Sequence, residues 1–340
     1  MTSTDLLPLD LPITGVSLVR WGQLYGAAQS LAVAHAVKQH AGTICVVTDS
    51  AATADGLERA LGFFLRGENI RRFSDYETLP YDAFSPPQEL IAERLSTLAT
   101  LANAEPSTLI VNAQALLTRL PSPGFIAARS MSLDKGDTIE RESLRKRLIS
   151  HGYLHAEKVL DPGEFAVRGS LLDIFPTGAT TPIRIDLFDD EVESLRTFDP
   201  ETQLSTGAVD RIRILPAREF PFDREAIRVF RENFRINLPG EPNRSRIYRD
   251  ISDANLPAGI EYFLPLFFEE TCSLFDYLPA DTLIIEIEGA YDGLDAGWAL
   301  IQERHVDGHR AISHDHHQGF GLGIAKKHPT EGRDGGTCYS

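Results

Sequence analysis

The chain has 340 residues, 42% of them hydrophobic, and its formal net charge is -16. This length is sufficient for two or three domains with separate hydrophobic cores. Acidic side chains outnumber basic ones by 49 to 33, whereas a protein that grips duplex DNA neutralises on the order of 6 to 10 phosphates with Lys and Arg. The composition therefore argues against nucleic acid as a direct partner of this chain.

Membrane insertion and disulfide bonding are also disfavoured. No apolar run approaches the roughly 18 residues of a membrane-spanning helix, and the N-terminus lacks the basic start of a signal peptide. The cysteines Cys45, Cys272 and Cys338 are widely separated and match neither a disulfide framework nor a C-x-x-C metal site. We expect a globular protein of the reducing cytoplasm, with no membrane partner.

The first part of the chain alternates between short apolar strands and amphipathic helices. This alternation predicts an α/β unit, in which helices cover the faces of a parallel sheet. The expected strands are 16–20, 43–47, 70–73 and 108–111, and the expected helices are 24–38, 54–64 and 88–102.

The pattern changes after Pro121-Ser122-Pro123-Gly124. Residues 125–132 alternate weakly, one amphipathic helix covers about 140–149, and residues 163–215 consist of strand patterns separated by turn residues. This segment predicts an α+β domain with an antiparallel sheet.

The composition becomes helical again from Glu219. Helices are expected at 224–235 and 244–251, followed by an aromatic run at 262–268. Residues 282–287 then form a continuous apolar run of the kind found in parallel sheets. We expect this run to return to the first sheet, which would make residues 125–215 an insertion.

The tail from about residue 305 has neither a helical nor a strand period. We expect a disordered or atypical terminus there. The spacing of its histidines matches no standard zinc pattern, so no metal and no other cofactor is predicted. These histidines are His305, His309, His314, His316, His317 and His328.

The most regular strand pattern lies at residues 183–188. One face of this strand would carry only Ile and Leu, and the other would carry Arg184, Asp186 and Phe188. Two interpretations remain open. The polar face is either a solvated surface with a salt bridge and one exposed Phe, or a binding surface with Phe188 as its apolar anchor and Arg168 as a neighbour.

A nucleotide hydrolase is the obvious enzymatic hypothesis, because a Gly-containing turn lies between the first expected strand and helix. A working P-loop needs a Gly and then a Lys that reaches the β- and γ-phosphates. Those two positions hold Ala28 and Gln29, although Gly26 and Ser30 remain. The loop therefore lacks the charge that holds the phosphates.

A second candidate for catalysis is Asp189-Asp190-Glu191, which resembles an acidic Mg²⁺-binding box. This run lies in the inserted segment rather than in the α/β unit that carries the degenerate loop. An acidic hairpin turn is therefore the better interpretation, and we expect no catalytic residues in this chain.

Several motifs, in the same order, closely resemble the N-terminal region of the bacterial transcription-repair coupling factors (the Mfd family). The resemblance covers roughly residues 15 to 305. Its motifs are Tyr76-Glu77-Thr78-Leu79-Pro80-Tyr81-Asp82-Ala83-Phe84-Ser85-Pro86, continued by Arg94-Leu95-Ser96-Thr97-Leu98, and then Gly163-Glu164-Phe165-Ala166-Val167-Arg168-Gly169, Asp173-Ile174-Phe175-Pro176, Phe188-Asp189-Asp190-Glu191 and Leu256-Pro257-Ala258-Gly259-Ile260-Glu261-Tyr262.

The resemblance implies an architecture similar to that of UvrB, a component of the excision-repair nuclease. A degenerate helicase-like α/β domain would be interrupted by a domain that binds UvrA, another component of that excinuclease, and followed by a smaller domain. The implied divisions are 1–122 (domain 1A-like), 123–216 (UvrA-binding, domain 2-like), 217–280 (mostly helical, domain 1B-like), 281–304 (return to the α/β sheet) and 305–340 (tail).

By motif, the UvrA-contacting residues of the family fall on Arg168, Arg184 and Phe188, with Asp186 as a neighbour. The resemblance thus implies a non-catalytic adaptor that brings nucleotide excision repair to stalled RNA polymerase. Contacts with RNA polymerase and DNA would belong to further parts of the family's longer proteins, including an ATP-driven translocase. The alternative is a fragment of an ATP-dependent helicase or nucleotide hydrolase.

Overall fold

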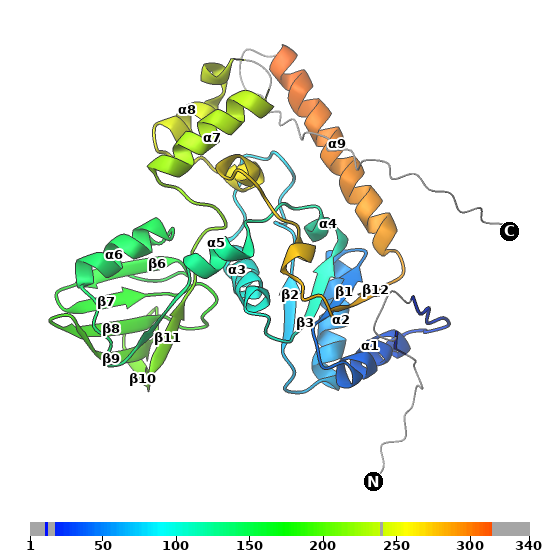
Figure 1. Ribbon diagram of the computed structural model, residues 1–340, viewed down its shortest axis with the longest axis horizontal. Coiled ribbons are helices and arrows are strands. Elements are labelled where there is room, and N and C mark those ends of the chain that lie inside the picture. Colours follow the sequence, from blue (N-terminus) through cyan, green and yellow to red (C-terminus); the bar gives the residue numbers. More distant parts are fainter. Residues whose placement is uncertain (1–10, 13–17, 239–240, 315–340) are drawn as a thin grey trace, which may run out of the picture.

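The computed structural model describes residues 11–12, 18–238 and 241–314, with side chains up to residue 304. The described residues form an α/β body, a β-rich domain and a helical part, and Figure 1 shows the β-rich domain set to one side of the body. None of the helices in these ranges is long and apolar enough to cross a membrane.

The α/β body is built on a parallel sheet of four strands within the described residues, in the order β12-β1-β3-β2. Alternate residues of β1 face different cores: Ile44 and Val46 pack against α1 and α2, whereas Cys45 and Val47 pack on the side of α3. The bounds are α1 Ala27–Gln39, β1 Ile44–Thr48, α2 Ala51–Phe64, β2 Ile70–Phe73, α3 Gln88–Ala102, β3 Thr108–Asn112, α4 Ala113–Leu116 and β12 Leu283–Glu286.

The expected first strand at 16–20 was wrong for its described part. Residues 18–20 are not in a strand, and residues 16–17 lie outside the described residues. The physical reason is that this apolar run is not buried against the sheet, since Leu18 is 80% exposed and Val19 is 38% exposed.

The Pro-containing segment after β3 is not an irregular linker with weak alternation behind it. Ser122 caps α5 (Pro123–Ala128) by accepting a hydrogen bond from the Phe125 N–H at 3.2 Å. Pro123 opens the helix, where its fixed φ and missing N–H are tolerated. Residues 125–128 therefore belong to a helix, and Phe125 and Ile126 join the core of the body.

The β-rich domain (residues 131–214) contains a sheet with six described strands, in the order β10-β9-β8-β7-β6-β5. All neighbouring pairs are antiparallel except β5 and β6. Helix α6 and the β4–β11 pair cover one face of this sheet and share its core. The bounds are β4 Met131–Asp134, α6 Arg141–Ser150, β5 Leu154–His155, β6 Glu164–Arg168, β7 Leu171–Ile174, β8 Ile183–Phe188, β9 Glu191–Phe198, β10 Ser205–Val209 and β11 Arg211–Ile214.

The helical part packs around an aromatic core. Asp223 caps α7 (Arg224–Asn237) by accepting a hydrogen bond from the Ala226 N–H at 2.9 Å. The aromatic run forms the 3₁₀ segment η2 (Ile260–Phe267), whose Phe267 ring lies 4.8 Å from that of Phe230. The remaining elements are η1 (Pro242–Arg244), α8 (Arg246–Ser252) and η3 (Leu274–Tyr277).

Helix α9 (Ala290–His314) corrects the expectation for the tail. The helix continues through residues 305–314, which include His305, His309 and His314. The helix formers that precede this stretch outweigh Gly308, since one helical Gly costs only about 1 kcal/mol. The other three histidines of the tail lie outside the described residues.

The mixed α/β fold class is thus confirmed: a parallel sheet and a mostly antiparallel sheet lie in separate parts of one chain.

Candidate interaction surface

The predicted alternation along β8 is present in the structure. Ile183, Ile185 and Leu187 are at most 6% exposed and pack in the core under α6. Arg184, Asp186 and Phe188 point to the opposite side of the sheet, which we call the outer face. Phe188 is 69% exposed there, so its ring is open to contact with a partner.

The strand register brings Arg168 to the same face. Arg168 on β6 lies opposite Leu171 on β7, and Leu171 lies opposite Asp186 on β8. Directly opposed residues point to the same side of a sheet, and two strand spacings amount to about 10 Å. The structure therefore places all four predicted partner-binding residues on one face.

Arg184 is the least available of the four. Its Nε donates to Asp173 Oδ1 at 2.7 Å, its Nη2 donates to Asp173 Oδ2 at 2.9 Å, and its Nη1 donates to the Gln203 carbonyl at 3.3 Å. The Phe198 ring lies 4.9 Å from the guanidinium carbon. The hydrogen bonds to the Asp173 carboxylate raise the pKa of Arg184.

The ion pair between Arg184 and Asp173 shows that each of the two interpretations of the face, a salt-bridged surface and a binding surface, applies to a different part of it. The side chains of Arg184 and Asp173 are 18% and 2% exposed, so their ion pair is part of the domain's interior. Phe188 has no such role. The face is therefore a salt-bridged sheet surface at Arg184 and an open surface at Phe188.

Arg168 and Asp186 each form one hydrogen bond that orients the side chain, but neither is shown in an ion pair with a described residue. Arg168 Nη2 donates to the backbone carbonyl of Glu157 at 2.6 Å, which orients the guanidinium and leaves its charge free. Asp186 Oδ1 accepts a hydrogen bond from the Ser170 hydroxyl at 3.2 Å. Both charges remain accessible to a partner, because Arg168 is exposed and Asp186 is half-buried.

Asp189 and Asp190 form the turn between β8 and β9. Asp189 adopts a φ of 52°, which hairpin turns require, and Phe188 lies opposite Glu191. The Asp190 carbonyl accepts the Ile139 N–H at 2.7 Å. The run Asp189-Asp190-Glu191 is therefore part of the β8–β9 hairpin, next to Phe188.

The expected nucleotide loop lies at the start of α1, on another part of the molecule. Gly26 precedes α1 with a φ of 58°, and Ala28, Gln29 and Ser30 lie in its first turn. A helix N-terminus attracts anions through its free N–H groups. The loop offers no Lys beside them.

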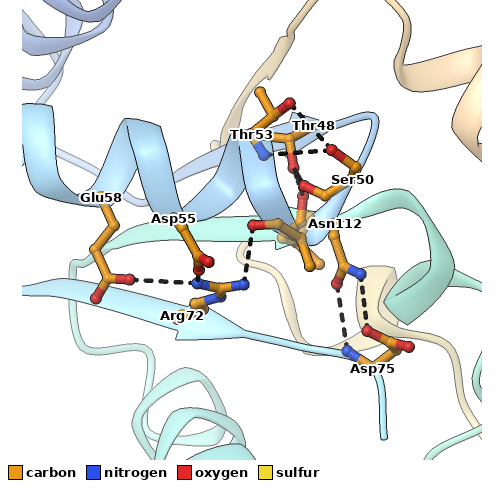
Figure 2. A network of polar contacts seen from close by, with 10 residues as sticks. Thr48, Ser50, Thr53, Asp55, Glu58, Arg72, Asp75 and Asn112 are labelled. Carbon is orange, nitrogen blue, oxygen red and sulfur yellow. Dashed lines mark hydrogen bonds and ion pairs between the residues drawn. The ribbon is translucent and has the colours of Figure 1, made fainter. Parts of the chain in front are cut away.

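Polar side chains at the carboxyl edge of the parallel sheet bond one another (Figure 2). Asn112 Nδ2 donates to Asp75 Oδ1 at 2.9 Å, and the Asp75 N–H returns a bond of 3.3 Å to Asn112 Oδ1. Ser50 caps α2, and Thr48 donates to the Ser50 carbonyl at 3.0 Å. Ligands bind at this edge in open α/β sheets, but here these polar groups form their hydrogen bonds with one another.

Arg72 completes this network as a structural residue. It forms ion pairs with Asp55 and with Glu58, the latter at 3.6 Å, and donates to the Ala51 carbonyl at 3.2 Å. All three partners lie on α2, so Arg72 ties β2 to that helix (Figure 2).

A cavity of about 630 Å³ is lined by residues 75–81 and by parts of α4, α7, η2 and α9. Its walls are mostly apolar, and the Tyr262 hydroxyl at its edge donates to the Thr78 carbonyl. None of the described residues that line it comes from the β-rich domain. The cavity is therefore separate from the outer face.

Two features of the outer face were missed in the sequence. Asp173 was not recognised as the partner of Arg184, and Arg196 was not placed on this face. The hairpin contains a bulge at Glu193, opposite the Asp186–Leu187 step, that puts Ser194 opposite Asp186 and Arg196 opposite Arg184. Counting residues from the turn would have put Leu195 opposite Arg184.

Comparisons with known proteins agree with this architecture. Residues 131–220 match the family model of the UvrB interaction domain. The chain is 40% identical over 307 residues to the transcription-repair-coupling factor of Escherichia coli K12, covering 89% of this chain and 27% of that protein. It is 42% identical over 269 residues to that of Haemophilus influenzae, covering 78% and 23%.

The transcription-repair-coupling factor of Bacillus subtilis is 27% identical over 276 residues. The chain spans about a quarter of the length of these curated relatives. It matches the N-terminal region of the bacterial transcription-repair-coupling factors, with the UvrB interaction domain at residues 131–220.

Proposed function

We propose that this chain is a non-catalytic module that binds UvrA through the outer face of its β-rich domain. In this role it recruits nucleotide excision repair to stalled RNA polymerase. Contacts with RNA polymerase and with DNA, and ATP-driven translocation, belong in this proposal to the further parts of the longer relatives.

One observation carries the proposal. Arg168, Arg184, Asp186 and Phe188 share one face of the domain that matches the UvrB interaction domain. An exposed aromatic ring beside oriented charges is the composition of an interface hot spot. In this arrangement Phe188 enters an apolar pocket of UvrA, and Arg168 pairs with a carboxylate at its rim.

The proposed domain division follows the motifs: 1–122 with 281–304 as a degenerate helicase-like α/β domain, 123–216 as the UvrA-binding insertion, and 217–280 as a smaller domain. Ala28 and Gln29 at the nucleotide loop make the first of these non-hydrolytic. A fluorescent-ATP titration of the chain should accordingly give no saturable binding, and micromolar binding would favour the helicase alternative.

Isothermal titration calorimetry of the chain against purified UvrA tests the proposed surface. Phe188→Ala should weaken binding at least about tenfold, as expected for an anchor residue. Phe63→Ala is the matched control, because Phe63 on α2 is 68% exposed and lies on the α/β body. Equal affinity of the two variants, or no binding by the wild type, would overturn the proposal.

Arg184→Ala is a poor first test of the same surface. The substitution removes the partner of a carboxylate that is 2% exposed, so weaker binding would follow from misfolding as well as from a lost contact. Arg168→Ala is preferable, since the exposed Arg168 side chain bonds only to a backbone carbonyl among the described residues.

A further inference from the structure

We propose that Arg196 is an additional contact residue of the outer face and pairs with a carboxylate of UvrA. This inference rests on the proposed function, and it goes beyond the motif residues named above. Its basis is the bulged register of the β8–β9 hairpin, together with the lack of an internal partner for Arg196 among the described residues.

The register fixes the position of Arg196. Arg196 on β9 lies directly opposite Arg184 on β8, and Ala208 on β10 lies on its other side. Phe198, two residues further along β9, packs against the Arg184 guanidinium on the outer face. Residues two apart on a strand point to the same side, so the Arg196 side chain leaves the sheet on the outer face.

The charge of Arg196 is not compensated within the part of the chain that the structure describes. Its side chain is exposed and forms no hydrogen bond or ion pair with any described residue. Like charges directly opposite each other destabilise a strand pair. Asp173 on β7 neutralises the charge of Arg184. Of the two opposed Arg side chains, only Arg196 therefore lacks an acidic partner among the described residues.

Arg168, Arg196 and Asp186 are accessible charges of the face, and all three lie on the side of Phe188 away from the hairpin turn. Arg168 lies on β6 and Arg196 on β9, and β8 with Phe188 lies between them. The two cations are three strand spacings apart across the sheet and two residues apart along it, which together amount to roughly 16 Å. Complementarity then calls for a partner surface with an apolar pocket and a carboxylate toward each side, one facing Arg168 and one facing Arg196.

The position of Arg196 also makes it suitable as a specificity residue. Arg184 is committed to Asp173, and a partner that approached it would compete with an existing ion pair. Arg196 has no such competitor among the described residues. A carboxylate on the partner therefore meets a guanidinium that has no internal ion pair to give up on binding.

Calorimetry of the full chain against purified UvrA tests this role. Arg196→Ala should weaken binding about tenfold, Arg196→Glu should weaken it further, and Arg196→Lys should retain part of the affinity. Lys146→Ala is the matched control for loss of one positive charge. Lys146 is exposed on α6, which packs on the other face of the sheet, so its loss should change the dissociation constant by less than about twofold.

The outcomes separate this inference from the proposed function. If Phe188→Ala weakens binding but Arg196→Ala behaves like Lys146→Ala, the role of Arg196 is wrong and the proposed surface stands. If neither Phe188→Ala nor Arg196→Ala has an effect, both proposals fall. Urea denaturation of each variant identifies unfolding, which is not expected because Arg196 is exposed.

Discussion

At the scale of single residues, Arg184 shows how a polar side chain on a sheet face can serve the fold. Asp173 is nearly inaccessible, and both of its oxygens accept hydrogen bonds from the Arg184 guanidinium. Without these hydrogen bonds, the loss of water around the buried carboxylate would destabilise the folded protein. The Asp of the Asp173-Ile174-Phe175-Pro176 motif is therefore a structural residue.

Arg184→Ala should lower the free energy of unfolding by about 3 kcal/mol, because it leaves Asp173 buried and unpaired. The midpoint of urea denaturation measures this loss. The double variant Asp173→Leu with Arg184→Met should recover most of it, since apolar pairs of similar volume replace buried ion pairs well. An unchanged midpoint in the single variant would contradict the structural role of the pair.

His151 gives the β-rich domain a pH-dependent stability. Burial, followed by the charges of Arg147 and Arg129, lowers the pKa of His151 to about 4. The unfolded chain therefore binds a proton between about pH 6.5 and pH 4 that the folded chain does not bind. Protein stability should decrease as the pH falls through this window.

His151→Gln should reduce this decrease by on the order of 1 kcal/mol, after allowance for the solvent screening of the partly exposed ring. The urea midpoints of the wild type and the variant, each measured at about pH 7 and about pH 4.5, give the comparison. Carboxylates titrate in both proteins, so the effect of His151 is the difference between the loss of stability in the wild type and the loss in the variant. Equal losses would show that the pKa of His151 is not lowered in the folded protein.

At the scale of secondary-structure elements, local patterns predicted most of the helices and strands. The bounds of β2 and α3 agree with the expected 70–73 and 88–102, because apolar periodicity and a Pro-containing start are both local signals. The hairpin register was not predictable in this way. The bulge at Glu193 depends on pairing between β8 and β9, and it alone places Arg196 on the outer face.

Helix α9 approaches the parallel sheet closely through Gly293. A Cβ atom on Gly293 would overlap the Asp49 backbone carbonyl and lie 3.0 Å from the Ala113 Cβ. Backbone atoms cannot move aside as a flexible side chain does. Because residue 293 has no side chain, α9 can begin in contact with the carboxyl edge of β1. The helix then runs away from the sheet toward the end of the molecule that holds α7 and α8 (Figure 1).

Gly293→Ala should therefore lower the free energy of unfolding by about 2 kcal/mol, the usual cost of overpacking, even though Ala favours helix formation. Gly56→Ala is the matched control. Gly56 is exposed within α2, and a Cβ atom added to it would have no neighbour within 4 Å, so its replacement should raise stability by roughly 0.5 to 1 kcal/mol. Opposite signs in urea denaturation are expected, and two stabilising substitutions would contradict the close approach.

At the scale of the whole molecule, the fold class followed from the order of the elements, because alternating strands and helices leave few sheet arrangements. The contacts that join the parts did not follow from it. Arg94 on α3 and Glu219, which follows the β-rich domain, are 125 residues apart in the sequence. No local pattern indicates that two charged side chains so far apart share one buried site.

Arg94 and Glu219 join the α/β body to the end of the β-rich domain. Their side chains are 0% and 2% exposed, and Arg94 Nε donates to Glu219 Oε1 at 2.7 Å. The Phe73 and Tyr76 rings each lie 4.3 Å from the guanidinium carbon. The Tyr76 hydroxyl donates to Glu219 Oε2 at 2.5 Å, so both carboxylate oxygens are bound within the body.

Glu219→Ala should therefore lower the free energy of unfolding by about 3 kcal/mol or more, because it leaves a fully buried Arg without its counterion. Arg211→Ala is the control, since it breaks an ion pair with Asp134 in which the side chains are 72% and 37% exposed; solvent screens such pairs, so they add little to stability. Limited proteolysis adds the measurement specific to this junction. Glu219→Ala should speed cleavage between β11 and α7, whereas Arg211→Ala should not, and equal cleavage rates would mean that the pair does not hold the two parts together.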